Sequence, residues 1–227
     1  MKQALSLHPL IVDARVQGLV FDLDGTLIDS ARDILQSIRL ALEDVGLGTL
    51  PDDYFPDNMH GTSMGIFRSV ISDMGWEIPE DMTPLRQAYL VHYQALDHRN
   101  TRLYPGVPEF LEACRDAGLS IAICTNKMHV FAMNALEKFG LQNTFGFVTG
   151  CDTWAEAKPS PIPLLETIRM LELQPAQSVY FGDTSVDAEC ANSAGVPFVL
   201  HESGYGDVAL HGQAKLLSFR RWEELMG

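Results

Sequence analysis

The feature that most constrains the fold of this chain is a strict alternation of short apolar runs and helical patterns after residue 106. Each apolar run is followed by a stretch in which apolar residues recur every three or four positions, as on one face of a helix. This alternation is typical of an α/β fold with a parallel sheet, right-handed crossovers and helices on both faces. With one earlier run near the N-terminus, it predicts a five-stranded sheet whose strands cover residues 18–21, 119–124, 145–149, 178–181 and 197–200.

A helical region separates the first expected strand from the second. Its periodicity predicts helices over residues 31–45, 62–74 and 83–98, and no strand-like run occurs among them. A chain of 227 residues is long for one minimal domain and short for two. We therefore expect a core domain made of residues 1–30 and 101–227, interrupted by a small helical domain of residues 31–100.

Two carboxylates stand where the first strand ends. Residues 18–21 are apolar and lead directly into Asp22-Leu23-Asp24-Gly25-Thr26. Asp22 and Asp24 are two positions apart, so in extended backbone they share one side, while Gly25 allows a sharp turn. Ligands of open parallel sheets bind at the carboxyl ends of the strands, which places both acids for chemistry. Either aspartate alone would also fit an Asx-turn.

Other expected strands end in polar groups as well. Thr125 and Asn126 follow the second strand, Asp183 follows the fourth with Asp187 one helical turn later, and Lys158 precedes Pro159. Singly, these residues fit helix caps, a surface lysine and a first-turn acid. Their recurrence at the carboxyl ends of three strands of one sheet instead indicates a common site.

In order and spacing, these motifs resemble those of the haloacid dehalogenase superfamily of phosphotransferases. The resemblance rests on D-x-D-G-T-L after a strand, T-N after the next, a lysine before proline and G-D-T-x-x-D, and it covers about residues 18–204. It implies a Rossmannoid three-layer sandwich with an inserted helical cap. The position of that cap resembles the smaller class that closes over the active site and sets substrate choice.

The resemblance also implies roles for the residues at the strand ends. Asp22 would attack phosphorus to form an aspartyl-phosphate, and Asp24 would protonate the leaving alcohol and then accept a proton from water. By the same resemblance, the groups that bind the transferring phosphoryl would be Thr125, Asn126 and Lys158.

A divalent metal ion is expected among the acids. Four carboxylates brought together raise one another's pKa values unless cations neutralise them. Oxygen ligands without histidine or cysteine suit Mg²⁺. The family pattern implies that the metal is bound by the Asp22 carboxylate, the Asp24 carbonyl and the Asp183 carboxylate, with Asp187 in support.

Within the superfamily, D-G-T-L-I-D-S and G-D-T-x-x-D are most similar to phosphoglycolate phosphatases and related small-phosphate monoesterases. The main alternative is a hexose phosphomutase of the beta-phosphoglucomutase kind, which resembles D-G-V more than D-G-T. A dehalogenase of this fold lacks the second aspartate, so Asp24 argues against it. The alternative from another class is a catalytically silent partner-binding protein.

A further prediction concerns substrate selection by the helical region. His60-Gly61-Thr62-Ser63 opens an expected helix, where free N–H groups and the helix dipole favour an anion. Thr62 and Ser63, with Arg68 about two turns later, are therefore candidates to receive a substrate carboxylate. The alternative is an ordinary capped helix start.

Charge and composition limit the partners. A formal net charge of −14 repels nucleic acid and anionic membrane, so a phosphate substrate needs a local positive site, which Lys158 and the metal would provide. No export signal or long apolar run is apparent. The four cysteines lack C-x-x-C spacing and are expected to be reduced in a cytoplasmic protein. The expected partner is a small phosphate ester, and the oligomeric state stays open.

Overall fold

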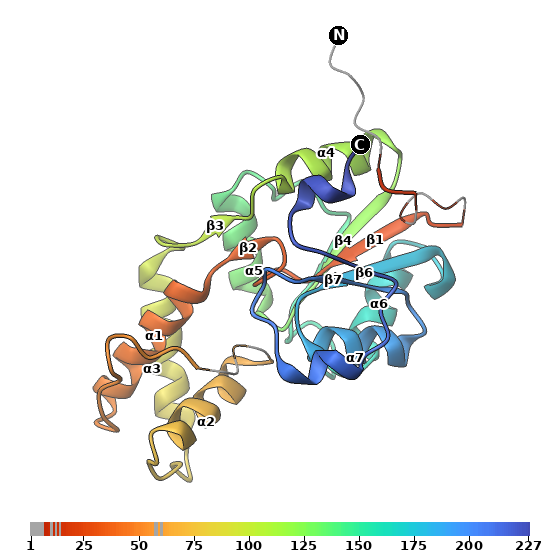
Figure 1. Cartoon of the computed structure of the whole chain (residues 1–227). Helices are drawn as coiled ribbons and strands as arrows, with labels where there is room; N and C mark the ends of the chain where they lie inside the picture. Colours follow the sequence, from red (N-terminus) through yellow and green to blue (C-terminus); the bar gives the residue numbers. More distant parts are fainter. Residues whose placement is uncertain (1–6, 10, 12, 14, 57–58, 60) are drawn as a thin grey trace. The chain divides into compact units, whose positions relative to one another are not determined.

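The computed structural model describes residues 7–9, 11, 13, 15–56, 59 and 61–227 (Figure 1). The chain divides into two compact units, one formed by residues 1–29 and 103–227 and the other by residues 30–102. None of the helices in the described part of the chain combines the length and the apolar composition that crossing a bilayer requires.

The first unit is built on a parallel sheet. Its six strands lie in the order β5-β4-β1-β6-β7-β8, with β1 in the interior of the sheet between β4 and β6. The carboxyl ends of β4, β1 and β6 therefore lie side by side. The strands are β1 (Gly18–Phe21), β4 (Ser120–Cys124), β5 (Phe147–Thr149), β6 (Ser178–Gly182), β7 (Phe198–His201) and β8 (Leu217–Phe219).

The predicted α/β class is confirmed, but the predicted strand number is wrong by one. The five expected strands are present, and β8 adds a sixth at the edge next to β7. This strand has three residues, of which only Phe219 is buried. So short and half-exposed a strand gives no apolar run, which explains why sequence periodicity did not predict it.

Helices cover both faces of this sheet (Figure 1). Successive β1 residues point to opposite faces, so Leu19 and Phe21 join one hydrophobic cluster and Val20 joins the other. The first cluster includes α4 and α5, and the second includes α6 and α7, which completes three layers. These helices are α4 (Val107–Asp116), α5 (His129–Lys138), α6 (Ile162–Met170) and α7 (Ser185–Ala194), with short 3-10 helices η1 (Pro175–Gln177), η2 (Val208–Gly212) and η3 (Trp222–Leu225).

An aromatic cluster fixes the carboxyl end of β1 within the core. The ring of Phe21 stacks on Phe181 of β6 with centroids 4.9 Å apart. Trp222, from the C-terminal η3, is fully buried and lies 4.8 Å from the rings of both Phe110 and Phe219. Such ring pairs bury large apolar areas in defined geometries, so the strand end that leads into Asp22 has a rigid base.

The second unit is helical. It contains α1 (Ala31–Asp44), α2 (Ser63–Asp73) and α3 (Thr83–Leu96). Tyr89 stacks on Tyr93 along α3 with centroids 5.6 Å apart, and Phe67 of α2 meets the Tyr89 ring edge-on at the same separation. These buried rings hold α2 against α3.

The start of α1 is fixed by a long-range contact rather than by a local cap. Ser30 makes no side-chain cap hydrogen bond. The fully buried carboxylate of Asp33 instead accepts hydrogen bonds from both nitrogens of Asn100 and from the amide and hydroxyl of Thr101, at 2.6–3.2 Å. The acid therefore joins the first turn of α1 to the segment after α3.

The chain leaves and re-enters the first unit through a small two-stranded sheet. Its strands are β2 (Ile28–Asp29) and β3 (Arg102–Leu103). Next to it, the Tyr104 amide donates to the Leu27 carbonyl at 3.0 Å.

Candidate active site

The backbone after β1 places the two aspartates of the first motif. The Asp22 amide still donates to the Phe181 carbonyl at 2.8 Å, so Asp22 continues the strand. The chain then turns tightly, and the Leu23 carbonyl accepts from the amides of Leu27 and Ile28 at 2.9 and 3.0 Å. Gly25 has a φ of 81°, and a Cβ at this position would overlap the carboxylate of Asp183. Glycine is therefore required here by both conformation and space.

Asp22 lies buried beside a lysine ammonium. The Lys158 Nζ is 2.9 Å from Asp22 Oδ1 and 2.6 Å from Asp187 Oδ1, and only 2% of the Lys158 side chain is exposed. Burial raises the pKa of Asp22 to about 6, although the Lys158 charge acts in the opposite direction. Burial alone would lower the pKa of Lys158, but Asp187 and Asp22 raise it above its ordinary value. Lys158 therefore stays charged and partly neutralises the acids.

Asp187 is the most firmly held of the acids. Its carboxylate accepts from the Lys158 ammonium at 2.6 Å and from the Thr184 hydroxyl at 2.7 Å, and the Tyr180 hydroxyl lies 3.0 Å from its Oδ1. Burial would raise its pKa, but the Lys158 charge and these hydrogen bonds lower it. Because these contacts engage both of its oxygens, Asp187 is suited to position Lys158.

Asp183 is the acid with the weakest charge compensation. It is fully buried and accepts from the Thr26 hydroxyl and the Tyr205 amide, both at 2.8 Å. Burial raises its pKa well above the usual value, and the charges of Asp187 and Asp22 add to the effect. A further cation beside this carboxyl would stabilise its ionised form.

The three buried acids could hold a divalent metal ion. Asp22, Asp183 and Asp187 each offer a carboxylate oxygen within 4.8 Å of the others. Asp22 Oδ1 is buried and, among the described residues, receives no aligned hydrogen bond, although Lys158 Nζ lies nearby as an ion-pair partner. Three carboxylates against one ammonium leave excess negative charge, and oxygen donors of this kind fit a hard cation.

The loop after β4 brings the next predicted residues to the same edge. The Thr125 amide donates to the Thr149 carbonyl at 2.9 Å, which continues the pairing of β4 with β5. The Asn126 side chain accepts from the Lys158 amide and donates to the Lys158 carbonyl, both at 3.0 Å. Asn126 thus fixes the backbone of Lys158. The structure brings together all seven core residues predicted for the site, which are Asp22, Asp24, Thr125, Asn126, Lys158, Asp183 and Asp187.

Sequence reasoning missed two residues of this site. Lys127 Nζ lies 2.9 and 3.0 Å from the two carboxylate oxygens of Asp24. The Tyr180 hydroxyl accepts from Lys158, lies 3.0 Å from Asp187 Oδ1 and donates to the Cys124 carbonyl at 2.8 Å. The sequence signal for Lys127 was its position directly after Asn126, which was predicted to belong to the site. Tyr180 gave none, because an aromatic residue in an apolar run indicates core.

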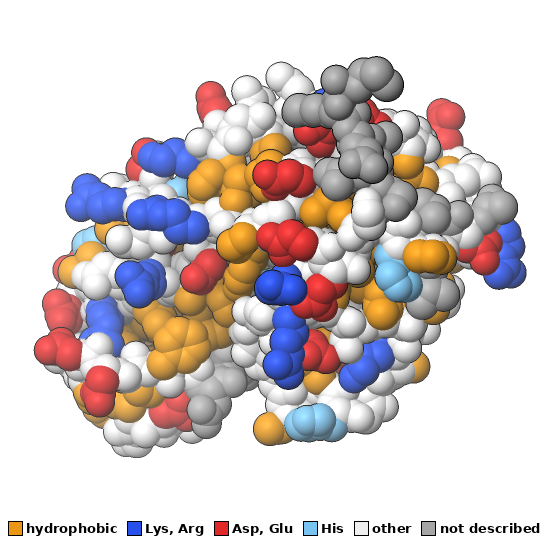
Figure 2. Space-filling model, turned by 45° about the horizontal axis from the view of Figure 1, so that its top comes forward, with side chains coloured by type: hydrophobic (Ala, Val, Ile, Leu, Met, Phe, Trp, Pro, Cys, Tyr) orange, Lys and Arg blue, Asp and Glu red, His pale blue; other side chains and the backbone are white. Residues whose placement is uncertain are grey.

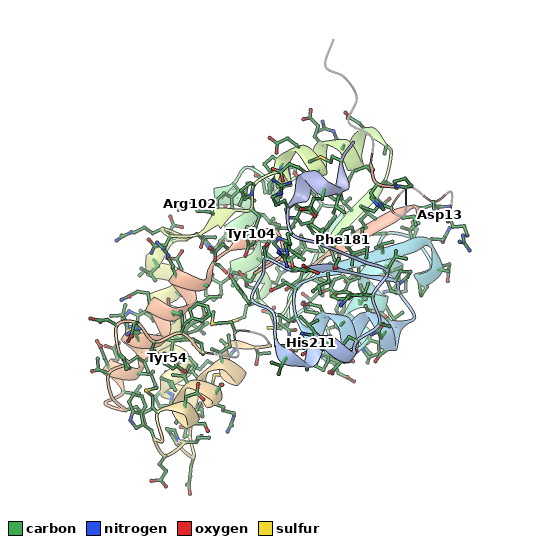
Figure 3. All side chains as sticks on the ribbon, in the orientation of Figure 1. Asp13, Tyr54, Arg102, Tyr104, Phe181 and His211 are labelled. Atoms are coloured by element: carbon green, nitrogen blue, oxygen red, sulfur yellow. The ribbon has the colours of Figure 1, made fainter. Side chains whose placement is uncertain are left out.

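Figure 3 labels Phe181, which is buried in the core of the first unit, and Tyr104, which is half-buried. The Tyr104 ring lies 4.6 Å from that of His201, whose Nδ1 is 2.8 Å from the carbonyl of Gly25. Burial lowers the pKa of His201, which keeps the imidazole neutral against the turn. The Gly25 turn is therefore fixed by packing as well as by the hydrogen bonds of β1.

The residues proposed for substrate selection belong to the second unit. Thr62 is the N-cap of α2, and its hydroxyl accepts from the Gly65 amide at 3.4 Å. Ser63 is the first residue of that helix and is half-buried, whereas Arg68 is exposed. His60 lies outside the described residues. The helix start thus has an ordinary cap, and its role toward substrate stays a prediction.

The parallel sheet has paired aspartates after one strand, a hydroxyl after the next, and after a third a cluster of acids paired with a lysine. This arrangement defines a class of phosphoryl-transferring α/β hydrolases. Comparison with known families agrees, because the family described as haloacid dehalogenase-like hydrolase matches residues 19–201. The chain belongs to this family, which confirms the resemblance inferred from its motifs. It is a phosphoric monoester hydrolase, that is, a phosphatase.

Its relatives point to one kind of phosphatase. Phosphoglycolate phosphatase of Agrobacterium fabrum is 35% identical over 195 residues, covering 84% of this chain and 82% of the relative. That of Aquifex aeolicus is 33% identical over 212 residues, covering 92% and 94%. The crystal structure of a predicted phosphoglycolate phosphatase from Haemophilus somnus superposes with a TM-score of 0.80 at 28% identity, covering 93% of this chain and 97% of that one.

Proposed function

We propose that this protein hydrolyses a small phosphate monoester, with phosphoglycolate as the first candidate, in a Mg²⁺-dependent reaction through an aspartyl-phosphate on Asp22. The observation that carries the proposal is the buried Asp22 carboxylate beside Lys158, at the edge of a carboxylate cluster. The names of the relatives support the choice of phosphoglycolate.

Asp22 and Asp24 divide the chemistry between them. An Asp22 oxygen attacks phosphorus, and the bond from phosphorus to the ester oxygen breaks as Asp24 transfers a proton to that oxygen. Water then attacks phosphorus and gives a proton to Asp24, while the bond to Asp22 breaks and restores the free carboxylate. One difficult displacement becomes two easier ones.

The other residues hold the phosphoryl group and its charge. In the proposal, the Thr125 hydroxyl, the Asn126 main-chain amide and the Lys158 ammonium bind the equatorial oxygens. Phosphoryl transfer depends on this positioning and on electrostatic stabilisation. The contacts of Lys158 with Asp187 and Asn126 support its role, because they fix the ammonium before substrate arrives.

The carboxylate cluster would bind the metal ion. We assign Mg²⁺ to the carboxylates of Asp22 and Asp183 and the main-chain carbonyl of Asp24, with Asp187 in support through Lys158. When bound, Mg²⁺ neutralises charge on the phosphoryl oxygens and on the acids. The raised pKa values of Asp22 and Asp183 agree with this assignment, because both acids lack a sufficient counter-charge.

The helical region of residues 31–100 is proposed to act as the cap of a core made of residues 1–30 and 101–227. Cap closure would exclude water until the phosphoenzyme forms. We place the enzyme in the cytoplasm because three of its four cysteines, Cys114, Cys124 and Cys190, are buried thiols. Its partner would be a small phosphate ester and, given the net charge of −14, no nucleic acid.

An Asp22→Asn variant tests the covalent mechanism. Hydrolysis of p-nitrophenyl phosphate and of phosphoglycolate should be abolished, because the amide is no nucleophile. Asp116→Asn, at an exposed position of α4, is the matched control and should retain full activity. Near-wild-type hydrolysis by Asp22→Asn would contradict the proposal.

Turnover by the wild-type protein should also require Mg²⁺. It should fall with Ca²⁺, whose looser coordination shell can take both oxygens of Asp22.

A further inference from the structure

Lys127 is a second buried cation at the site, and the reaction scheme above does not use it. Its side chain is only 5% exposed, and its ammonium contacts both oxygens of Asp24. Its main chain is fixed as well, because its amide donates to the Thr125 hydroxyl at 3.2 Å and its carbonyl accepts from the Cys151 amide at 3.0 Å. A lysine held in this way is unlike the solvated surface lysines of an ordinary loop.

The two lysines serve different carboxylates. Lys158 contacts Asp22 and Asp187, whereas Lys127 contacts Asp24, the proposed proton donor to the leaving oxygen. A general acid lies about 2.6–3.2 Å from the atom that it protonates. Since Lys127 Nζ is 2.9 Å from Asp24 Oδ1, the ammonium comes within about 6 Å of the ester oxygen of a bound substrate.

This separation matches the chemistry of phosphoglycolate. The carboxylate carbon of that ester is two bonds from the ester oxygen, so the carboxylate oxygens lie about 3 Å from it. A carboxylate there comes within hydrogen-bond reach of the Lys127 ammonium while the phosphoryl group faces Asp22. A lysine ammonium has three donors, so it can contact Asp24 and the substrate together.

We propose that Lys127 recognises the substrate carboxylate and thereby selects phosphate monoesters that have a carboxylate on the carbon next to the ester oxygen. This inference rests on the proposed function and names the residue that sets its substrate class. A neutral leaving group leaves the ammonium without this second partner. A cationic leaving group meets repulsion at short range, in a site with little exposure to solvent.

The test compares two substrates that share an alkoxide leaving group and differ in charge, phosphoglycolate and 2-hydroxyethyl phosphate. For Lys127→Met, we expect kcat/KM for phosphoglycolate to fall by about 10²-fold, mainly through KM, because a charged hydrogen bond in a buried site is lost. The loss of kcat/KM for 2-hydroxyethyl phosphate, which reports only the lost ion pair with Asp24, should be at least about tenfold smaller than the loss for phosphoglycolate. Lys127→Arg should retain most of the preference, and Lys138→Met, at an exposed position of α5, should change neither substrate.

Two results would overturn the inference while leaving the proposed function intact. One is an equal loss, or no loss, for both substrates in Lys127→Met. The other is a loss confined to phosphoglycolate in Thr62→Leu or Ser63→Leu but not in Lys127→Met, which would assign the carboxylate to the start of α2. If Lys127→Met does not fold, as judged by its thermal midpoint, Lys127→Gln serves the same comparison. A wild-type protein that releases phosphate from neither ester would overturn the proposed function, and the inference with it.

Discussion

At the scale of single residues, the site is a balance of buried charges. Lys158 contacts two of the three clustered carboxylates, those of Asp22 and Asp187, and Lys127 contacts a fourth, that of Asp24. Each ion pair is desolvated, so removal of one partner leaves an uncompensated charge in a low-dielectric environment. Substitutions at these residues should therefore change both activity and stability, so each test needs readouts that separate the two effects.

The first prediction at this scale concerns proton transfer by Asp24. Asp24→Asn keeps the nucleophile but removes the acid and base, so kcat should fall by ~10²- to 10⁴-fold. With p-nitrophenyl phosphate, whose leaving group needs little protonation, the phosphoenzyme should still form and then persist. Rapid-mixing measurements should show a burst of one p-nitrophenolate per site, followed by slow turnover. A slow reaction without a burst would show that Asp24 is not needed for dephosphorylation.

A second prediction concerns the space around Asp183. A Cβ added at Gly204 would lie 2.5 Å from both Asp183 Oδ2 and the carbonyl oxygen of Gly25, closer than atoms pack. Gly204→Ala should therefore displace the Asp183 carboxylate and raise the Mg²⁺ concentration needed for half-maximal activity by about tenfold or more, the range known for groups that orient metal ligands. Gly212→Ala, where a Cβ meets nothing within 4 Å, is the control. Identical metal titrations for the two variants would count against Asp183 as a ligand.

At the scale of elements, α1 and the segment after α3 are joined by one buried acid. The Asp33 carboxylate accepts from the amides of Asn100 and Thr101 and from both of their side chains. These hydrogen bonds therefore join the beginning and the end of the second unit. A helix start in this protein is thus fixed by residues far away in the sequence rather than by its own cap.

Asp33→Ala should lower the stability of the second unit by about 3–5 kcal/mol, because it leaves several buried donors without an acceptor. Asp33→Asn retains one acceptor oxygen and should lose less. Hydrogen exchange of the α1 and α3 amides measures the effect locally, with Glu43→Ala, at an exposed position near the end of α1, as the control. Unchanged protection in Asp33→Ala would show that helix packing alone stabilises the unit.

The elements also show which parts of the fold can be predicted from sequence. Strands buried on both faces are apolar along their whole length, so β1, β4, β6 and β7 stand out in the sequence. The edge strand β8 is short and partly exposed, and it does not. The same distinction holds for the site. Acids at strand ends reveal themselves by position, whereas Lys127 finds its partner Asp24 103 positions away, and one sequence contains no signal for that pairing.

At the scale of the whole molecule, the dominant quantity is negative charge. The chain has a formal net charge of −14, and acidic and basic side chains are interspersed over the face shown in Figure 2. A substrate with two anionic groups is repelled by this field as a whole. Binding therefore depends on short-range contacts with the two buried lysines and the metal ion, which are screened little by salt.

Stability in the absence of metal should fall as the pH rises. Burial raises the pKa of Asp22 from 3.8 to about 6, and burial together with Asp187 and Asp22 raises that of Asp183. A carboxyl whose pKa is raised by folding stabilises the fold fully below its unfolded value, and this contribution is lost as the pH rises through the folded value. Asp187, whose pKa is lowered, acts in the opposite direction, but only as the pH falls below about 3.8.

Thermal midpoints in EDTA should therefore decrease from about pH 5 to about pH 7, and Mg²⁺ should raise the midpoint more at the higher pH, where it competes with fewer protons. Asp183→Asn removes one of the titrating acids and should flatten both trends. A stabilisation by Mg²⁺ that does not change with pH would contradict the assignment of these acids as ligands.

The pairing of β2 with β3 has a consequence for how such a protein can diversify. Residues 30–102 leave and return to the first unit through adjacent strands, so their two attachment points lie close together. A segment attached in this way can be lengthened, shortened or exchanged without stretching the sheet that holds the reactive aspartates, since insertions are tolerated where chain ends meet. The helical unit and the sheet that holds the reactive aspartates are then separable modules. Recombination at Asp29 and Arg102 would exchange the helical unit and leave that sheet unchanged.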